Sequence, residues 1–119
     1  WAYPFKFNHD IISDCREIIL VESIGDMLSL WESGIKNTGV TFGTGASSGL
    51  LKALIRLNPR KIIIATNNDK NGAGQRAASK IKYALSTFFD QEQLRVVYPD
   101  KNDFGDQSVD ENKTWYSKL

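Results

Sequence analysis

Short apolar runs alternate with longer amphipathic segments along most of this chain. Two of the runs, 18–21 and 62–65, are apolar at every position, which is typical of strands buried on both faces of a parallel sheet. After each run, apolar residues recur at three- and four-residue spacing, as they do along one face of a helix. This alternation predicts an α/β fold: a compact domain with a mainly parallel sheet, right-handed crossovers and helices on both faces.

We expect about four strands in this sheet. They are the segments 18–21, 38–42, 61–65 and 94–98. A helix is expected after each of the first three strands. The third of these helices has an apolar face formed by Ala77, Ile81, Ala84, Leu85 and Phe88. Ser108 and Glu111 have the spacing of a capping box, which predicts a short final helix that contains Trp115 and Tyr116.

Aromatic residues occupy alternate positions near the start of the chain: Trp1, Tyr3, Phe5 and Phe7. The alternation predicts a short, half-buried edge strand over residues 1–8, where Pro4 is tolerated because the rim of a sheet leaves some N–H groups unpaired. Packing is the role we favour for these rings. Stacking on nucleobases is the alternative.

A connector rich in metal-ligating residue types follows this predicted strand. It contains His9, Asp10, Asp14 and Cys15. A zinc site is disfavoured, because the chain has no second Cys/His pair at ligand spacing. The single cysteine excludes an internal disulfide and suggests a reducing compartment such as the cytoplasm.

The length of 119 residues fits a single domain, and the net charge of +1 means that any basic surface must be local. The apolar runs are far shorter than the roughly 20 residues that span a bilayer, so we expect no membrane segment. Because the chain opens on Trp1 instead of Met, we expect a piece of a longer protein. Within it we distinguish an edge segment at 1–16, a core at 17–106 and a C-terminal helix at 107–119.

Acidic residues follow three of the predicted strands: Glu22 and Asp26 the first, Asp69 the third, and Asp103 with Asp106 the last. Since ligands of parallel sheets bind outside the carboxyl ends of the strands, these side chains should converge there. Converging carboxylates repel one another unless a cation joins them, and Mg²⁺ takes carboxylate oxygens together with water and substrate phosphate. The pattern favours a phosphoryl-transfer or phosphodiester site. The alternative is that these are ordinary helix-cap and loop acids.

A loop of small residues, Gly43-Thr44-Gly45, leads into the predicted helix at 50–57. Backbone N–H groups of such a turn can hold phosphate oxygens. The loop lacks the lysine of a P-loop and the full spacing of a dinucleotide fingerprint, so a plain tight turn fits equally well.

Basic residues flank the acids in sequence, at Lys70, Arg76 and Lys101. They could hold triphosphate or template phosphates. A second basic group lies at positions 52, 56, 60 and 61 and fits an ordinary solvated helix face equally well.

Four segments together resemble the TOPRIM domain shared by bacterial-type primases, type IA and II topoisomerases and several nucleases. Residues 18–26 are similar to its strand with a Glu-Gly-x-x-Asp segment, and residues 42–45 to its Gly-Thr loop. Residues 67–78 resemble its Asp-x-Asp motif and the Ala-Gly-x-x-Ala-Ala helix start of the primase branch. Residues 99–106 are similar to an acid-bearing loop of primases. The resemblance covers roughly 17–106.

The resemblance implies that Glu22 and Asp69 are catalytic, metal-site residues, with Glu22 the preferred candidate for proton transfer. It implies Asp26, Asp103 and Asp106 as supporting acids, and Mg²⁺ or Mn²⁺ as the cofactor.

Three features depart from the family pattern. Ser23 replaces a glycine, which asks only for an ordinary backbone angle. Asn67 stands where the first Asp of Asp-x-Asp is expected, and its amide oxygen can ligate a metal but brings no charge. We therefore expect weaker Mg²⁺ binding, or one metal where relatives hold two. Extra residues between Asp69 and Ala73 lengthen the adjoining loop, which suggests a divergent, phage-like primase.

As a whole, the resemblance implies the metal-binding domain of a DNA primase, which joins ribonucleoside triphosphates into RNA primers on a single-stranded DNA template. A companion subdomain, a zinc module and contacts with a replicative helicase would then lie outside this chain, and the piece alone need not be active. Two alternatives remain open. One is a fragment of a TOPRIM nuclease or topoisomerase. The other is a non-catalytic module that binds nucleic acid or a replication partner, in which Asn67 marks a decayed metal site.

Overall fold

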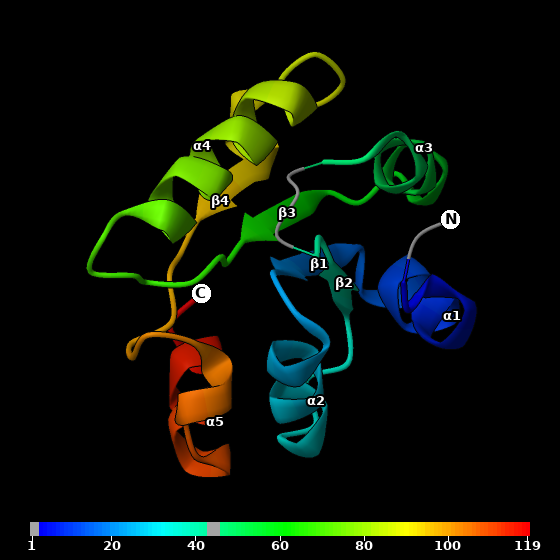
Figure 1. The fold of residues 1–119 in the computed structure, drawn as a ribbon. Coiled ribbons are helices and arrows are strands. Elements are labelled where there is room, and N and C mark those ends of the chain that lie inside the picture. Colours follow the sequence, from blue (N-terminus) through cyan, green and yellow to red (C-terminus); the bar gives the residue numbers. More distant parts are fainter. Residues whose placement is uncertain (1–2, 43–45) are drawn as a thin grey trace.

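The computed structural model describes residues 3–42 and 46–119. At its centre lies a parallel sheet of four strands in the order β2-β1-β3-β4 (Figure 1). The strands are β1 (Glu17–Val21), β2 (Thr38–Val40), β3 (Lys61–Ile64) and β4 (Leu94–Val96). The α/β fold with a parallel sheet, predicted from the alternation of apolar runs and amphipathic segments, is confirmed.

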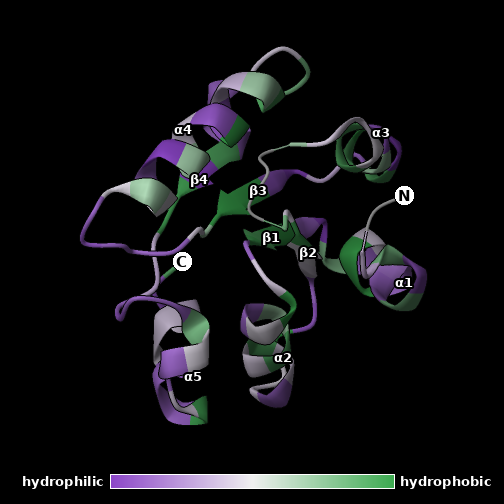
Figure 2. Ribbon diagram, viewed as in Figure 1, coloured by the Kyte–Doolittle hydropathy of each residue, from purple (hydrophilic) through white to green (hydrophobic). Residues whose placement is uncertain are grey.

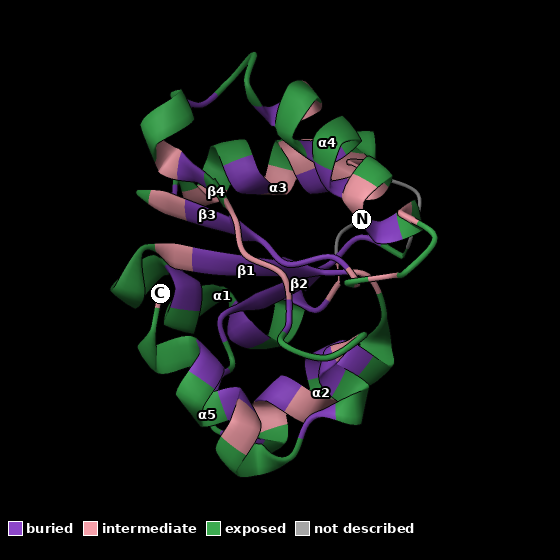
Figure 3. Cartoon of the chain, turned by 90° about the vertical axis from the view of Figure 1, so that its left-hand side faces the viewer, coloured by how far each residue is buried: buried purple, intermediate pink, exposed green. Residues whose placement is uncertain are grey.

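Helices cover both faces of the sheet. They are α1 (Phe5–Cys15), α2 (Ile24–Glu32), α3 (Ser48–Leu57), α4 (Ala73–Leu85) and α5 (Val109–Ser117), with short 3₁₀ turns η1 (Gln91–Gln93) and η2 (Phe104–Asp106). Apolar residues of α1, α3 and α4 join one core, and those of α2, η2 and α5 join the other. Figure 3 shows α3 and α4 on one side of the strands and α2 and α5 on the other.

The two central strands explain why their sequences are apolar without alternation. In β1, Ile18 and Leu20 point into the core with α3 and α4, whereas Ile19 and Val21 point into the core with α2 and α5. Ile62 and Ile63 of β3 divide in the same way. Figure 2 shows both strands as mostly hydrophobic, as a strand covered on both faces must be.

The prediction of an edge strand over residues 1–8 is wrong, because residues 5–15 form helix α1. The buried residues of α1 are Phe5, Asn8 and Ile12, a helical stripe that alternation of aromatic residues does not reveal. Asn8 is polar but buried, since its amide donates to the Lys36 and Thr38 carbonyls at the start of β2. The segment before α1 does contact the edge strand of the sheet, because the Val40 N–H of β2 donates to the Tyr3 carbonyl at 2.9 Å.

The connector predicted at His9 to Cys15 is also helical, as it is part of α1. The apolar face predicted for α4 included Phe88, which lies beyond the end of the helix. The helix ends at Leu85, and the N–H groups of Phe88 and Phe89 both donate to its carbonyl. This turn leaves Phe88 53% exposed and buries Phe89 in its place.

The final helix forms as its capping box predicts. The Ser108 hydroxyl accepts from the Glu111 N–H at 3.1 Å, and the Glu111 carboxylate accepts from the Ser108 N–H at 2.9 Å. The hydrogen bonds that the Glu111 carboxylate accepts from the Ser108 N–H and from Lys101 hold its pKa below the usual range. None of the helices in the described ranges is both long enough and apolar enough to cross a bilayer.

Candidate functional site

Glu22 and the segment 67–69 follow neighbouring strands, β1 and β3, and meet at the carboxyl edge of the sheet. A Glu22 carboxylate oxygen accepts the Asn67 N–H at 3.1 Å, which ties the two strand ends together. Glu22 and Asp69 are both half-buried, so each side chain is held by the fold and still open to solvent. The convergence predicted for these two acids is therefore present in the structure.

The electrostatics of Glu22 reflect this crowding. Burial raises the pKa of the Glu22 carboxyl, and the charges of Asp69 and Asp26 raise it further. The Asn67 N–H opposes both effects, because it stabilises the ionised form. Burial is the largest cause of the upward shift, and the smaller contributions of Asp69 and Asp26 show that the carboxylates also repel one another at this edge of the sheet, which a bound cation would relieve.

The loop between β3 and α4 is pinned at its end by Gly74. The Gly74 N–H donates to the Asp69 carboxylate at 3.0 Å, and the Gly74 carbonyl accepts from the Thr66 hydroxyl at 2.7 Å. A side chain at this position would collide with the Asn67 carbonyl, so only glycine allows α4 to start this close to β3. Asp69 is thereby fixed at the N-terminus of α4, where the helix dipole favours its negative charge.

Asp26 has a different environment, although it lies only four residues from Glu22. It is 3% exposed, and its carboxylate accepts from the N–H groups of Phe104 and Gly105 and from the Ser23 hydroxyl. Burial outweighs these hydrogen bonds and raises the pKa of the Asp26 carboxyl, and the charge of Asp103 adds to the shift. Through these hydrogen bonds Asp26 connects α2 to η2, and both of its carboxylate oxygens are engaged by groups of the protein itself.

The acids of the last loop lie along the turn η2. Asp103 is half-buried and accepts the Asp106 N–H at 2.9 Å, so that it caps the turn near Asp26. Asp106 is exposed at the far end of the same turn. The Lys101 ammonium is engaged at the far end of this turn, since it pairs with Glu111 at 3.0 Å and donates to the Asp106 carbonyl at 3.4 Å. The metal role of Asp103 and Asp106 and the phosphate role of Lys101 stay predictions.

Two other predicted phosphate ligands lie beside Asp69. Lys70 is exposed at the start of the loop. Arg76 is exposed on the first turn of α4, and its guanidinium donates to the Asn71 carbonyl at 3.1 Å, which braces the lengthened loop. The third element of the prediction, Gly43-Thr44-Gly45, lies outside the described residues.

The fit of a divalent cation depends on the donors that this edge offers. Within residues 3–42 and 46–119, no three His, Cys, Asp or Glu side chains come close enough together to hold a metal ion by themselves. Mg²⁺, however, usually takes only one or two carboxylates and completes its shell with water and substrate phosphates. The mutually repelling pair Glu22 and Asp69 fits that use, with the Asn67 amide as a neutral oxygen donor nearby.

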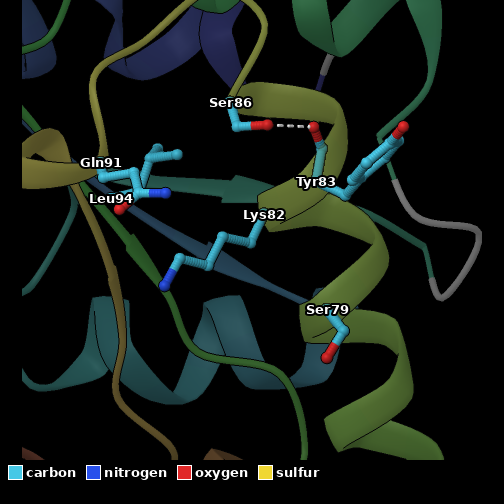
Figure 4. Close-up of a pocket in the computed structure, with 6 residues that line it drawn as sticks. All are labelled: Ser79, Lys82, Tyr83, Ser86, Gln91 and Leu94. Carbon is cyan, nitrogen blue, oxygen red and sulfur yellow. Dashed lines mark hydrogen bonds between the residues drawn. The ribbon is translucent and has the colours of Figure 1, made fainter.

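A pocket of about 300 Å³ lies elsewhere, on the α4 side of β4. Figure 4 shows its lining, with Ser79, Lys82 and Tyr83 on α4, Ser86 directly after it, and Gln91 and Leu94 opposite them. It contains no acid of the candidate site. We therefore place the chemistry at the carboxyl edge of the sheet and not in this pocket.

The sequence analysis missed a buried polar network that holds the last loop in place. The Asn112 amide donates to Ser29 on α2 and to Ser33 directly after it, and its oxygen accepts from Gln107. The Ser29 hydroxyl in turn donates to the Phe104 carbonyl at 2.6 Å. A buried asparagine opposite two serines is a recognisable pattern only once the packing of α5 on α2 is known.

A model of the family described as Toprim-like matches residues 19–108. The chain belongs to the Toprim-like family. This match includes every acid of the candidate site and confirms the resemblance that the motifs predicted.

Among relatives, a DNA primase of Synechocystis is 36% identical over 115 residues, which cover 91% of this chain and 18% of that primase. The RNA polymerase domain of Mycobacterium tuberculosis primase has the same fold, with a TM-score of 0.74 at 17% identity over 98% of this chain and 39% of that one. A primase catalytic domain solved bound to single-stranded DNA gives a TM-score of 0.70 at 21% identity, over 97% of this chain and 37% of that one.

This chain thus spans less than a fifth of the length of the curated primases that it matches. It is a Toprim domain related to a segment of bacterial DNA primases. The curated relatives are bacterial and one matched structure comes from bacteriophage T7, so these matches do not support the phage-like origin.

Proposed function

We propose that this chain is the metal-binding part of a DNA primase active site, in which Glu22 and Asp69 hold Mg²⁺ or Mn²⁺ for the synthesis of RNA primers on single-stranded DNA. The observation that carries the proposal is the convergence of these two half-buried carboxylates at the ends of β1 and β3. The relation to bacterial primases supports it. Ribonucleoside triphosphates and a DNA template are the substrates that such a reaction requires, in the cytoplasm, with a replicative helicase as partner through parts outside this chain.

Each residue then has a distinct part in binding. When bound, the cation would neutralise phosphate charge and assist the attacking 3′ hydroxyl. Asp69 is held at the N-terminus of α4 by the Gly74 N–H, so its free oxygen is directed by the backbone and not by a flexible stem. Glu22 is held by the Asn67 N–H and, with its raised pKa, is suited to take the proton of the attacking hydroxyl.

A non-catalytic binding module is the second candidate, and two observations favour it. Asn67 contributes no charge to the site, and the described residues gather no group of three metal-ligating acids. In such a module, nucleic-acid binding would be unaffected by a chelator and by loss of the Glu22 charge. A nuclease or topoisomerase fragment would use the same acids, but it would act on DNA without ribonucleoside triphosphates.

The test is a titration of Mg²⁺ and Mn²⁺ followed by amide NMR on the whole chain. We expect site-specific shifts at Glu22, Asn67 and Asp69, which Glu22→Gln abolishes. Glu32→Gln is the matched control, because Glu32 is an exposed glutamate at the opposite end of α2.

Primer synthesis is then measured in the full polypeptide that carries this chain. Loss of synthesis in Glu22→Gln, with normal synthesis in Glu32→Gln, would support the catalytic proposal. Unchanged synthesis in Glu22→Gln would overturn it.

A further inference from the structure

Three aromatic rings gather beside the carboxyl edge of the sheet, and the proposed site does not use them. The Tyr3 ring lies 6.5 Å from that of Phe7, at the start of α1, and 6.3 Å from that of Phe42, just after β2. The ring planes meet at 70° and 56°, so no ring lies flat on another. Phe7 is 67% exposed and Phe42 is 49% exposed, so the cluster presents apolar ring surface to solvent.

The cluster is a neighbour of the proposed catalytic pair. β2 is adjacent to β1 in the sheet, and the Thr41 N–H donates to the Val21 carbonyl at 2.8 Å. Val21 pairs with Val40 in the register of the two strands, so Glu22 is level with Thr41 and Phe42 follows one residue further on. Neighbouring strands lie about 5 Å apart. Along this edge the order is therefore aromatic cluster, Glu22, then Asn67 to Asp69.

Phe42 has an unfavourable backbone conformation. Its φ is +59°, in the left-handed region that glycine enters freely and a bulky side chain enters only at a cost in stability. A costly backbone conformation that leads to an exposed ring points to a use for that ring. Phe5, two residues before Phe7, contrasts with it, because its ring is buried against Gly39 of β2.

We propose that Phe42, Phe7 and Tyr3 form a platform on which an unpaired base of the single-stranded DNA template stacks, one strand away from the Glu22–Asp69 pair. This inference rests on the proposed function for the identity of the strand. Every nucleobase offers a flat apolar face, and exposed rings that do not cover one another can receive it without regard to sequence. Lys6, exposed on the same turn of α1 and in no ion pair within the described part of the chain, supplies a cation for the adjoining phosphate.

The experiment compares two labelled oligonucleotides by fluorescence anisotropy, using the whole chain with a chelator and without nucleotides. One is oligothymidylate of roughly 12 nucleotides, a usual site size, and the other is an abasic strand of the same length. The abasic strand has the same phosphates but no base to stack. We expect the thymidylate to bind about tenfold more tightly, the effect of one good stack.

The variants separate stacking from other uses of the surface. Phe42→Ala and Phe7→Ala should each reduce the preference for bases, and Phe42→Tyr should keep it. Phe88→Ala is the matched control, because Phe88 is another exposed phenylalanine, 53% exposed, beyond the end of α4. Thermal melting verifies that each variant is folded, and the exposed Phe7 gives a second test if Phe42 variants unfold.

The proposal is overturned by equal binding of both strands to the wild type, or by a preference for bases that survives Phe42→Ala and Phe7→Ala. It is also overturned if Phe42→Leu binds as tightly as the wild type, since the surface would then be a general apolar contact. Displacement of thymidylate by free nucleoside triphosphate would assign the platform to the incoming nucleotide instead. Glu22→Gln should leave this binding intact, so its outcome is separate from that of the metal test.

Discussion

Glu22 and Asp26 are carboxylates four residues apart on adjoining elements, and the fold uses them in opposite ways. Glu22 is half-buried, accepts one hydrogen bond from Asn67 and faces a second acid, Asp69. Asp26 is buried and accepts hydrogen bonds from Phe104, Gly105 and Ser23. Both have a raised pKa, yet only Glu22 keeps access to solvent and to a neighbouring carboxylate.

The difference shows that a raised pKa alone does not distinguish a site from a scaffold. Structural acids shift for the same reason as catalytic acids, namely burial. What separates the two is where the remaining oxygens point. The carboxylate oxygens of Asp26 accept hydrogen bonds from protein N–H and O–H groups. Glu22 and Asp69, in contrast, form no ion pair with a lysine, arginine or histidine among the residues that the structure describes.

The largest effect expected is on catalysis. Glu22→Gln keeps an oxygen that accepts the Asn67 N–H but removes the charge, so folding should persist. Primer synthesis should fall about 100-fold or more, since even the partners of metal ligands typically cost about 10–100-fold when removed. Steady-state synthesis in the full polypeptide measures this. A variant that unfolds, or that keeps full activity, would contradict the role given to Glu22.

Asp26 should respond in stability instead of activity. Asp26→Ala leaves the buried Phe104 N–H without its acceptor and should lower the free energy of unfolding by about 2 kcal/mol. Asp26→Asn keeps an acceptor oxygen and should recover most of this loss. Urea denaturation of the two variants provides the measurement, and equal losses would mean that charge, and not hydrogen bonding, holds η2 to α2.

Asn67→Asp would make the candidate site more like the family pattern. The added charge beside Glu22 and Asp69 should tighten Mg²⁺ binding about tenfold, because affinity for hard cations rises with the number of charged ligands. Isothermal titration with Mg²⁺ compares the variant with the wild type. Asn68→Asp, one residue further along the same loop, is the control for a general effect of negative charge. Unchanged affinity in Asn67→Asp would argue for a decayed site.

The smallest effect concerns pH. The pKa of Asp26 is raised from its ordinary 3.8, so between the two values the folded state binds more protons than the unfolded state. The contribution of Asp26 to stability is therefore fully present below pH 3.8 and declines as pH rises through the folded pKa. Asp26→Asn mimics the protonated form, so its stability relative to the wild type should increase with pH. Melting temperatures across acidic pH test this, and a decrease would mean that ionised Asp26 is the better accommodated form.

Sequence reasoning succeeded where one rule of the fold decides the outcome. The runs 18–21 and 62–65 are apolar because both faces of β1 and β3 are covered, and Glu22 and Asp69 meet because parallel strands end at one edge. It failed where the decisive partner is distant. The N–H groups that occupy Asp26 come from positions 78 and 79 residues later, and no local pattern announces them.

The helix α1 was missed for a related reason. Its buried stripe includes Asn8, whose amide N–H groups find acceptors in the Lys36 and Thr38 carbonyls of a later segment. Alternating rings at Tyr3, Phe5 and Phe7 then gave the stronger local signal. In the structure these rings go to different places, with Phe5 in the core and Phe7 at the surface.

The close approach of Gly74 to the Asn67 carbonyl limits how this loop can change during evolution. Substitution at position 74 would push α4 away from β3 and carry Asp69 with it, so this position should tolerate no other residue. Insertions should be easier to accommodate than a substitution at position 74, because residues 70–72 lie outside that contact and turn at Gly72, whose φ is +80°. We therefore expect the length of the loop to vary among descendants of this domain, whereas the contact between Gly74 and the Asn67 carbonyl should be kept.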